Sequence, residues 1–445
     1  MRLRATTPPR SEGTLWLLCE LYSPELTSTG YYATAIAEHL AQFGSISVLC
    51  GQPNYGSRGK QAPKREALNG VEVQRCSGTT FDKNNLLGRI VNMLTLTISV
   101  FARLVVSARK SDRVLVLTNP PIIPYAAWLA CLLRRAQLTV LIHDNYPEVL
   151  SATGIAAKPP LVFLMTKMRN FVVRSSQHVI VVGRDMADLL TKSSGRSEIV
   201  VIPNWAELEQ VRPIAKTASS LQDFAASFVV MNAGNIGQPN ELETVLAAAA
   251  LLRGESAIQF VFLGEGAKKQ WLQEQIMSRS LTNIHLLPPL PRSQQTDFLG
   301  IADLGLITLV DSMLGVSVPS RGYNLLAAGK PIVAVLAKHS ELARLVAEEQ
   351  VGWVVPPGNG ELLAQAVLEA KNNRPLLFTM SNKAREVALK RCSAQQSLHA
   401  YQTLFFPKSE TSAPRLGQLN IFSNGTTEVP SPRHDPLVSS VRLCK

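Results

Sequence analysis

The stretch Val318-Pro-Ser-Arg-Gly-Tyr-Asn-Leu-Leu-Ala-Ala-Gly-Lys-Pro-Ile-Val-Ala334 has the pattern of a polar loop, a short helix and a buried strand. Ser320 is a preferred residue at a helix N-cap, and Gly329 is the preferred residue just after a helix C-terminus. Pro331 prevents the helix from continuing, and the apolar run after it is typical of a strand. The stretch therefore predicts one loop–helix–strand unit of an α/β fold.

The start of this predicted helix has the composition of an anion-binding site. The first backbone amides of a helix have no partner within the helix, and the helix dipole favours negative charge there. Ser320 and Arg321 stand at this end, and the amides of Gly322 and Tyr323 follow. We expect these groups to hold a phosphate.

The same kind of unit recurs along the chain. The runs Arg113–Thr118 and Leu138–Ile142 are largely apolar, as are parallel strands that are buried on both faces. Helical patterns separate such runs up to about residue 206, and the alternation starts again at Phe228. The pattern predicts two doubly wound, Rossmann-like domains with a cleft where the carboxyl ends of their strands face each other.

The predicted organisation has six parts. The last part is rich in Ser, Thr, Pro and Arg and poor in large apolar residues, so we expect it to be disordered. The parts are a flexible N-terminus (1–14), a first Rossmann-like domain (15–206), a linker (207–226), a second Rossmann-like domain (227–380), a closing helix (381–406) and a disordered tail (407–445).

Composition restricts the partners and the compartment. The 445 residues include 45 Lys and Arg against 33 Asp and Glu, which gives a net charge of +12. The basic residues are scattered and are not interleaved with aromatic residues, so an anionic membrane or an anionic small molecule is favoured over nucleic acid. The six cysteines lie far apart and mostly in apolar runs, which indicates reduced thiols and a cytoplasmic protein.

The segment Ile90–Val106 is the part of the sequence that bears on a membrane. Polar residues interrupt it and basic residues flank it, and a spanning helix needs about 20 clean apolar residues, so we expect it not to span. Two interpretations remain open. It is either a long helix packed on the sheet or a helix that lies in an anionic leaflet as a peripheral contact.

Loops after the strands of the second half contain most candidate ligand-binding residues. Glycines in such loops permit close approach of a diphosphate to the backbone, although glycine turns after strands are also common without a ligand. A lysine at a helix start either neutralises phosphate charge or is simply solvated. The candidates in these loops are Gly234, Asn235, Gly237, Glu265, Lys268, Pro289 and Asp311.

His143 and Asp144 form a polar pair at the end of the predicted strand Leu138–Ile142. A pair in this position is expected to face the cleft, where a histidine and a carboxylate can take part in chemistry. The alternative is that Asp144 caps the following turn and His143 makes a local hydrogen bond. Spacing alone does not separate these two interpretations.

The sequence has no zinc-ligand spacing, nucleophile elbow, Walker motif or D-x-D pair. A bound diphosphate would therefore be met by Arg321, lysines and backbone amides instead of a metal ion. We expect no metal site and no cofactor.

Read in order, these loops resemble the family 4 glycosyltransferases, which have the two-domain GT-B fold. The resemblance is greatest to the bacterial exopolysaccharide branch with its colanic-acid-type transferases, and it covers about Leu15 to Asn372. The matching pieces are Tyr22-Ser-Pro-Glu25 through Gly30, Thr118-Asn-Pro-Pro121, His143-Asp-Asn-Tyr-Pro-Glu148, Ile202-Pro-Asn-Trp205, Gly234-Asn-Ile-Gly237, Leu263-Gly-Glu-Gly266 and Pro319-Ser-Arg through Pro331.

The resemblance implies a nucleotide-sugar donor in the second domain, an acceptor in the first, and transfer that retains the anomeric configuration without a metal. It also implies that the closing helix crosses back onto the first domain. The implied catalytic pair is His143 and Asp144. The implied acceptor-side residues are Glu25, Gly30 and Tyr31, and the implied donor residues are those of the loops above together with Ser320, Arg321, Gly322, Asn324 and Glu341.

The sequence departs from the family at two positions. Members often carry two glutamates eight residues apart, the second of which usually holds the nucleotide ribose. Here Val316 and Asn324 stand at these positions. An asparagine can still hydrogen-bond a ribose hydroxyl, and Asp311 or Glu341 are candidate substitutes for the first glutamate.

The leading interpretation is a retaining glycosyltransferase of exopolysaccharide, capsule or O-antigen biosynthesis. Its acceptor would be a lipid-linked oligosaccharide at the inner face of the plasma membrane. The missing glutamates favour an alternative, a catalytically silent GT-B subunit that binds lipid or a partner. A nucleotide-sugar epimerase would need an acid–base set that the sequence does not assemble.

Overall fold

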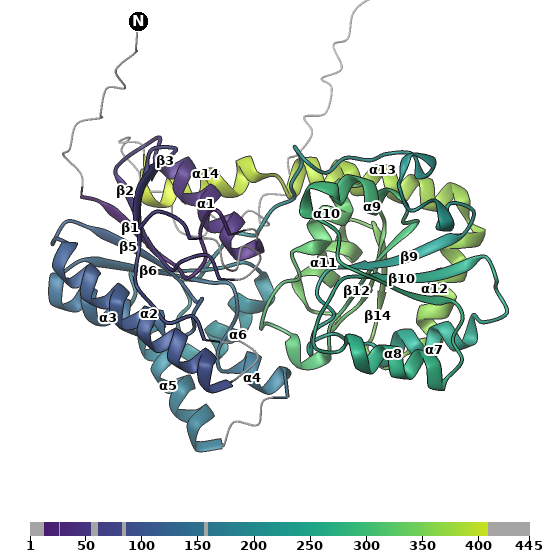
Figure 1. Cartoon of the computed structure of the whole chain (residues 1–445), viewed down its shortest axis with the longest axis horizontal. Coiled ribbons are helices and arrows are strands. Elements are labelled where there is room, and N and C mark those ends of the chain that lie inside the picture. Colours follow the sequence, from purple (N-terminus) through teal and green to yellow (C-terminus); the bar gives the residue numbers. More distant parts are fainter. Residues whose placement is uncertain (1–12, 26, 55–60, 82–85, 155–158, 408–445) are drawn as a thin grey trace, which may run out of the picture.

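The computed structural model describes residues 13–25, 27–54, 61–81, 86–154 and 159–407. It consists of two α/β domains side by side, joined through the linker and again by the closing helices (Figure 1). The predictions for residues 1–12 and for the tail 408–445 lie outside the described residues.

The first domain is built on an eight-stranded sheet in the order β3-β4-β2-β1-β5-β6-β7-β8. All neighbours are parallel except β3, which pairs antiparallel with β4. The strand order reverses between β1 and β5, so the loops after these two strands diverge at a crevice. The strands are β1 (Leu15–Leu18), β2 (Ile46–Cys50), β3 (Arg65–Leu68), β4 (Val71–Arg75), β5 (Arg113–Leu117), β6 (Gln137–Ile142), β7 (His178–Val181) and β8 (Val200–Val201).

Helices cover both faces of this sheet. Helices α2, α3 and α5 contact one another in a row, whereas α1 contacts β2 and the last helix of the chain (Figure 1). The helices are α1 (Ser28–Leu40), α2 (Leu86–Ser107), α3 (Ile123–Arg134), α4 (Glu148–Ala152), α5 (Pro159–Ser175) and α6 (Arg184–Ser194).

The second domain has a fully parallel six-stranded sheet in the order β11-β10-β9-β12-β13-β14. Here the order reverses between β9 and β12, and apolar side chains fill the strands on both faces. The strands are β9 (Phe228–Ala233), β10 (Ile258–Leu263), β11 (Ile284–Leu287), β12 (Leu304–Thr308), β13 (Ile332–Val335) and β14 (Gly352–Val355). The helices are α7 (Glu243–Leu251), α8 (Lys269–Ser278), α9 (Gln295–Gly300), α10 (Arg321–Ala327), α11 (Glu341–Glu348) and α12 (Gly360–Asn372).

The chain closes with two helices, α13 (Arg374–Arg391) and α14 (Ala394–Phe405). The single closing helix expected over 381–406 is therefore wrong. The break coincides with a contact between distant segments, because the carbonyl of Cys392 leaves the helical pattern and accepts a hydrogen bond from the Ala206 amide at 2.8 Å. α14 then packs on α1 of the first domain. The five cysteines in the described part are buried and unpaired.

Candidate active site

The cleft between the domains contains a cavity of about 610 Å³. Most of its wall comes from the second domain, through the loops after β9 and β10, the residues before α9, and α10. The first domain contributes the start of α1. The wall residues used below are Thr27, Ser28, Tyr32, Glu207, Gly234, Asn235, Asn240, Glu265, Pro289, Arg292, Gln295, Ser317, Ser320, Arg321 and Asn324.

Arg321 is a half-buried cation on this wall. Among the described residues, its Nη1 donates hydrogen bonds to the Asn232 side-chain oxygen and the Asn235 carbonyl, both at 3.3 Å. Its Nε is buried without a hydrogen-bond partner. No acidic side chain pairs with Arg321 within the part of the chain that the structure describes. Burial lowers the pKa of Arg321 to about 10, so the group remains charged at neutral pH.

Gly234 brings the loop after β9 close to this guanidinium. Its φ is +135°, and a Cβ added there would lie 3.5 Å from Nη1 of Arg321. The loop after β10 lies directly against the loop after β9, because a Cβ on Gly264 would fall 1.9 Å from the Gly234 carbonyl oxygen. Only glycine fits this packing of two loop backbones, so the wall beside Arg321 is backbone.

The first amides of α10, which we expected to be free to hold a phosphate, are hydrogen-bonded within the protein. The amides of Gly322 and Tyr323 donate at 3.1 Å to the carbonyls of Pro319 and Ser320 in a tight turn. Ser320 occupies the N-cap position with a helical ψ of −21° and makes no capping hydrogen bond. Arg321 is therefore the cationic group that this segment brings to the cavity wall, and Ser320 lies beside it there.

Asn324 is bound within the protein. Its Nδ2 donates to the Glu207 carboxylate at 2.6 Å and to the Gln295 side chain at 2.9 Å, and its Oδ1 accepts from the Glu207 amide at 2.9 Å. Arg292 completes the cluster with a bidentate contact to Glu207 at 2.7 and 2.8 Å. The guanidinium of Arg292 also lies 4.7 Å from the centre of the Tyr31 ring. This cluster joins the linker, the second domain and the first domain.

Glu207 is one of several wall residues that were not predicted from the sequence. Its side chain is only 2% exposed, yet it lines the cavity. The available signal was an acidic residue two positions after the loop Ile202-Pro-Asn-Trp205, which follows a predicted strand. Because the sequence pattern places Glu207 in the linker, it was not expected at the cavity.

Several predicted donor residues lie away from the cavity wall. Lys268 donates to the Asn240 carbonyl at 2.8 Å, and Gly237 donates its amide to the Asn240 side chain at 2.8 Å. Both therefore support Asn240, which is a wall residue. Asp311 is exposed outside the wall, and Gly322 is buried against Leu342.

Of the predicted residues, Glu265 and Pro289 do line the cavity. The Glu265 carboxylate is mostly exposed and pairs with Lys269 one helical turn further on. Pro289 belongs to the loop after β11. Their place on the wall is consistent with the predicted contacts to a donor, which stay predictions.

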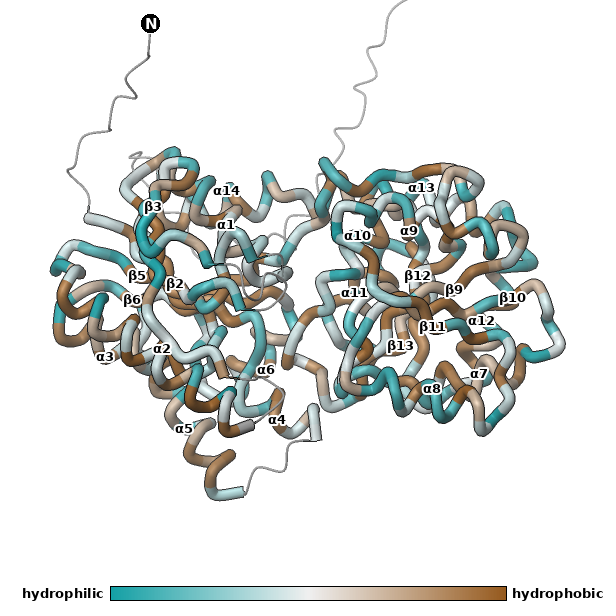
Figure 2. Tube along the Cα trace, in the orientation of Figure 1, coloured by the Kyte–Doolittle hydropathy of each residue, from teal (hydrophilic) through white to brown (hydrophobic). Residues whose placement is uncertain are grey.

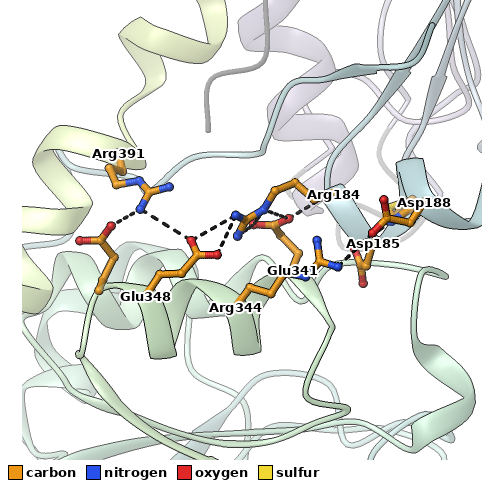
Figure 3. A network of polar contacts seen from close by, with 9 residues as sticks. Arg184, Asp185, Asp188, Glu341, Arg344, Glu348 and Arg391 are labelled. Atoms are coloured by element: carbon orange, nitrogen blue, oxygen red, sulfur yellow. Dashed lines mark hydrogen bonds and ion pairs between the residues drawn. The ribbon is translucent and has the colours of Figure 1, made fainter. Parts of the chain in front are cut away.

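Glu341 was a candidate substitute for a missing glutamate, and the structure places it in a different role. Its buried carboxylate receives the Arg184 amide at 2.6 Å and the Arg184 guanidinium at about 3.0 Å (Figure 3). The Arg184 guanidinium also forms an ion pair with Glu348 at 2.8 Å, and Arg344 forms one with Asp188 at 2.9 Å. These contacts connect α6 of the first domain with α11 of the second, so Glu341 serves the domain interface.

His143 and Asp144 begin a loop that contacts the second domain. Asp144 forms a backbone bridge with Ser317, and the Asn145 amide donates to the Val316 carbonyl at 2.8 Å. Val316, at the first glutamate position of the family, is buried with Ala152 and Met313. This segment is therefore an interdomain contact instead of a carboxylate site.

Neither side chain of the predicted catalytic pair lines the main cavity. His143 packs edge-on to Tyr32 at 6.4 Å, and Tyr32 does line it. Burial lowers the pKa of His143 to about 4 and raises that of Asp144 to about 6. The His143 Nε2 is buried without a partner, which leaves one orphaned ring nitrogen one layer behind the wall.

The predicted acceptor-side residues Glu25, Gly30 and Tyr31 do not line the cavity, although their neighbours in the same segment do. The Glu25 carboxylate accepts from the Asn54 amide at 2.9 Å, and Gly30 donates its amide to Thr27 at 3.2 Å. Thr27, Ser28 and Tyr32 face the cavity. Within the described ranges, no three His, Cys, Asp or Glu side chains gather in a way that suits a metal ion.

Two family models match this chain. One describes a "Glycosyl transferase 4-like domain" and matches residues 28–205; the other describes "Glycosyl transferases group 1" and matches residues 219–387. Together they cover well over half of the chain, one model for each domain. The chain belongs to glycosyltransferase family 4.

Two curated relatives of this family 4 glycosyltransferase extend over most of its length. It is 27% identical over 361 residues to the probable glycosyltransferase WbjE of Pseudomonas aeruginosa, covering 80% of this chain and 88% of the relative. It is 25% identical over 375 residues to the putative colanic acid biosynthesis glycosyl transferase WcaI of Escherichia coli (strain K12), covering 79% and 91%. The chain therefore falls among the glycosyltransferases of polysaccharide biosynthesis.

Solved structures agree on the fold, which is GT-B as predicted. Sucrose-phosphate synthase from Thermosynechococcus elongatus aligns with a TM-score of 0.72 at 14% identity, over 88% of this chain and 98% of that one. Anabaena Alr3699/HepE in complex with UDP-glucose aligns with a TM-score of 0.67 at 17% identity, over 88% and 99%.

Proposed function

We propose that this glycosyltransferase moves a sugar from a nucleotide-sugar donor to a lipid-linked glycan acceptor, with retention of the anomeric configuration and without a metal ion. The observation that carries the proposal is the Arg321 guanidinium on the cavity wall, which has no acidic partner among the described residues and whose Nε is buried without a hydrogen-bond partner. A partly buried cation without an anionic partner is costly, and a diphosphate supplies the missing charge. The solved HepE complexes, described as holding UDP, UDP with glucose, and UDP-glucose, support a donor of this class.

The proposed chemistry follows from the position of this charge. The acceptor hydroxyl attacks the anomeric carbon on the face that the diphosphate leaves, a new C–O bond forms as the sugar–phosphate bond breaks, and the hydroxyl proton passes to the leaving diphosphate. Arg321 stabilises the negative charge that grows on the diphosphate. The acceptor enters from the side of Thr27 and Ser28, at the start of α1.

The donor class is tested by incubating the full chain with uridine, guanosine and thymidine nucleotide sugars. We expect thermal stabilisation and slow donor hydrolysis with one of them. Arg321→Ala should abolish both effects, and Arg253→Ala, an exposed arginine of the same domain, should leave both unchanged. No response to any donor in the wild type would contradict the proposal.

Two further measurements test the finer statements. Activity that survives an excess of EDTA supports transfer without a metal, and loss of activity that Mg²⁺ restores would refute it. Proton NMR of the product made from an α-linked donor should show an α-anomeric signal. A β-anomeric product would show inversion instead.

One observation favours a second candidate, a silent binding subunit. Asn324 is already hydrogen-bonded to Glu207 and Gln295, and Val316 is packed at the domain contact, so neither family glutamate position presents a carboxylate to a donor. In this case the wild type would bind a nucleotide sugar but neither hydrolyse it nor transfer it to extracted lipid-linked acceptors.

A further inference from the structure

Exposed apolar side chains gather on three helices of the first domain. Within the described residues, 22 large apolar side chains are exposed, and 14 of them belong to α2, α3 and α5. Scattered exposed apolar residues are normal, but a contiguous group marks an interaction surface. The 14 are Leu87, Ile90, Val91, Leu94, Ile98, Val106, Leu129, Leu132, Leu133, Leu161, Phe163, Leu164, Met168 and Phe171. We call this surface the three-helix face.

The three-helix face is continuous. α3 contacts both α2 and α5, and Trp128 of α3 packs edge-on against Phe171 of α5 with ring centres 5.0 Å apart. In Figure 2 the hydrophobic colour follows α3, α2 and α5 at the outer edge of the first domain. Only 28% of the residues in the most apolar part of α2 are buried, and six of the large apolar side chains of this helix are exposed.

The charge of this face has one sign. The sequences of α2, α3 and α5 contain no Asp or Glu. They carry exposed basic residues, among them Arg89, Arg134, Lys167 and Arg174. Lys167 lies 5.2 Å above the ring of Phe163, so a cation stands directly beside an exposed aromatic residue.

We propose that the three-helix face binds the surface of an anionic lipid bilayer, with its apolar side chains at the acyl boundary and its basic groups among the headgroups. An anionic leaflet offers acyl chains to the apolar side chains and negative headgroups to the basic groups, so it is complementary to both. A second copy of the chain would bring two basic surfaces together at the same place, which costs energy. The inference extends the membrane contact predicted for Ile90–Val106 to α3 and α5.

α2 meets the bilayer lying along it instead of crossing it. By length and composition Leu87–Ser107 is able to span a membrane, as are some core helices of soluble proteins. Its inner side, however, contains Leu96, Val100 and Leu104, all buried in the core of the first domain. Arg103 also donates to Gln74 of β4 at 2.8 Å. Crossing would require removal of these side chains from the core, whereas interfacial binding uses the side that is already exposed.

This binding does not rest on the proposed donor or acceptor, and it is tested without either of them. The full chain is floated with vesicles of phosphatidylcholine alone and of phosphatidylcholine with phosphatidylglycerol. We expect flotation with the anionic vesicles only. The triple variant Ile98→Ser, Leu132→Ser, Phe163→Ser should bind at least about tenfold more weakly, since each change removes a large apolar side chain from the interface.

A matched control carries the same kind of change on the second domain, at Leu251, Met277 and Phe378, which are equally exposed. The triple variant Leu251→Ser, Met277→Ser, Phe378→Ser should float like the wild type. Thermal unfolding of both triple variants verifies that they fold. Arg89→Gln and Lys167→Gln should each weaken binding roughly fivefold, the ratio for about 1 kcal/mol per basic residue.

Three results would overturn the inference. The first is a wild type that floats with neither vesicle, and the second is an equal loss of flotation in the two triple variants. The third is a wild-type dimer in sedimentation that the triple change in α2, α3 and α5 converts to a monomer, because the occupant of the face would then be a second copy.

Discussion

Asn324 and Glu207 hold each other through a reciprocal pair of hydrogen bonds, from Nδ2 of Asn324 to the Glu207 carboxylate at 2.6 Å and from the Glu207 amide to Oδ1 of Asn324 at 2.9 Å. The two residues are 117 positions apart. Through this pair, the chain places a buried carboxylate from the linker beside α10, where relatives of this family often have a glutamate on the helix itself. Its neighbour Arg292 lies against Tyr31 of the first domain.

Glu207→Ala should lower the free energy of unfolding by about 2–4 kcal/mol, because it breaks a partly buried ion pair with Arg292 and removes one of the two acceptors of the Asn324 side-chain amide. Urea unfolding measures the change. Glu209→Ala, two residues further along and exposed, is the control and should change stability by less than about 0.5 kcal/mol. Equal losses in the two variants would show that the Glu207 cluster does not stabilise the domains.

Asn324→Glu should destabilise the protein at pH 7, although it restores the residue common in the family. The new carboxylate would stand within hydrogen-bond distance of the Glu207 carboxylate in a buried site, and two like charges there repel each other. We expect a loss of about 1–3 kcal/mol that shrinks as the pH falls towards 5. Adding Glu207→Gln should recover most of the loss, and a double variant as unstable as Asn324→Glu would refute this explanation.

Much of the fold could be predicted from the sequence, and each element that was missed has a physical reason. The strands β5 and β6 lie where apolar runs predicted them, and β9 begins at Phe228 as expected, since buried parallel strands are apolar throughout. β3 was missed because its four residues are exposed or half-buried and its pattern is polar. The break before α14 depends on a hydrogen bond between Cys392 and Ala206, which local periodicity does not reveal.

The candidate site, like the fold, could be predicted from the sequence only in part. Gly234 and Arg321, which line the cavity, were predicted because strand ends in α/β sheets converge on one edge. Glu207 and the true partners of Glu341 and Lys268 were not identified, because each depends on a contact between segments distant in the sequence. The amides of α10 were misjudged because Ser320 adopts a turn and not a capping conformation.

Glu341→Ala should destabilise the protein by about 3 kcal/mol, since it leaves the partly buried Arg184 guanidinium without its main acceptor. Its effect on donor binding, measured at a temperature where the variant is fully folded, should be less than about twofold. Glu348→Ala removes the exposed carboxylate that also pairs with Arg184. It should lower the free energy of unfolding by at most about 1 kcal/mol. A stable Glu341→Ala protein with lost donor binding would return Glu341 to the donor site.

His143 should make stability depend on pH below neutrality. Burial lowers its folded pKa to about 4, below an ordinary value near 6.5, so the folded state resists protonation. The stability that depends on neutral His143 is fully present above pH 6.5. As the pH falls from 6.5 to 4, the free energy of unfolding decreases by up to about 3 kcal/mol. Asp144, with its pKa raised to about 6, acts in the opposite direction, so the measurement compares variants.

The comparison uses His143→Gln, which cannot titrate. Between pH 7 and pH 4 the wild type should lose more free energy of unfolding than His143→Gln, with Asp144 present in both proteins. Parallel curves for the two proteins would show that His143 is accessible to water and titrates normally.

The central claim is that Arg321 meets the diphosphate of a nucleotide donor, and calorimetric titration with a nucleoside and its diphosphate tests it most directly. The two ligands share a base and a ribose, so the ratio of their affinities isolates the diphosphate. In the wild type and in Arg253→Ala the diphosphate should bind much more tightly than the nucleoside. In Arg321→Ala that preference should fall by about 30- to 100-fold, the loss of a charge-assisted contact worth roughly 2–3 kcal/mol, while the nucleoside affinity stays constant. An unchanged preference for the diphosphate in Arg321→Ala would contradict the account.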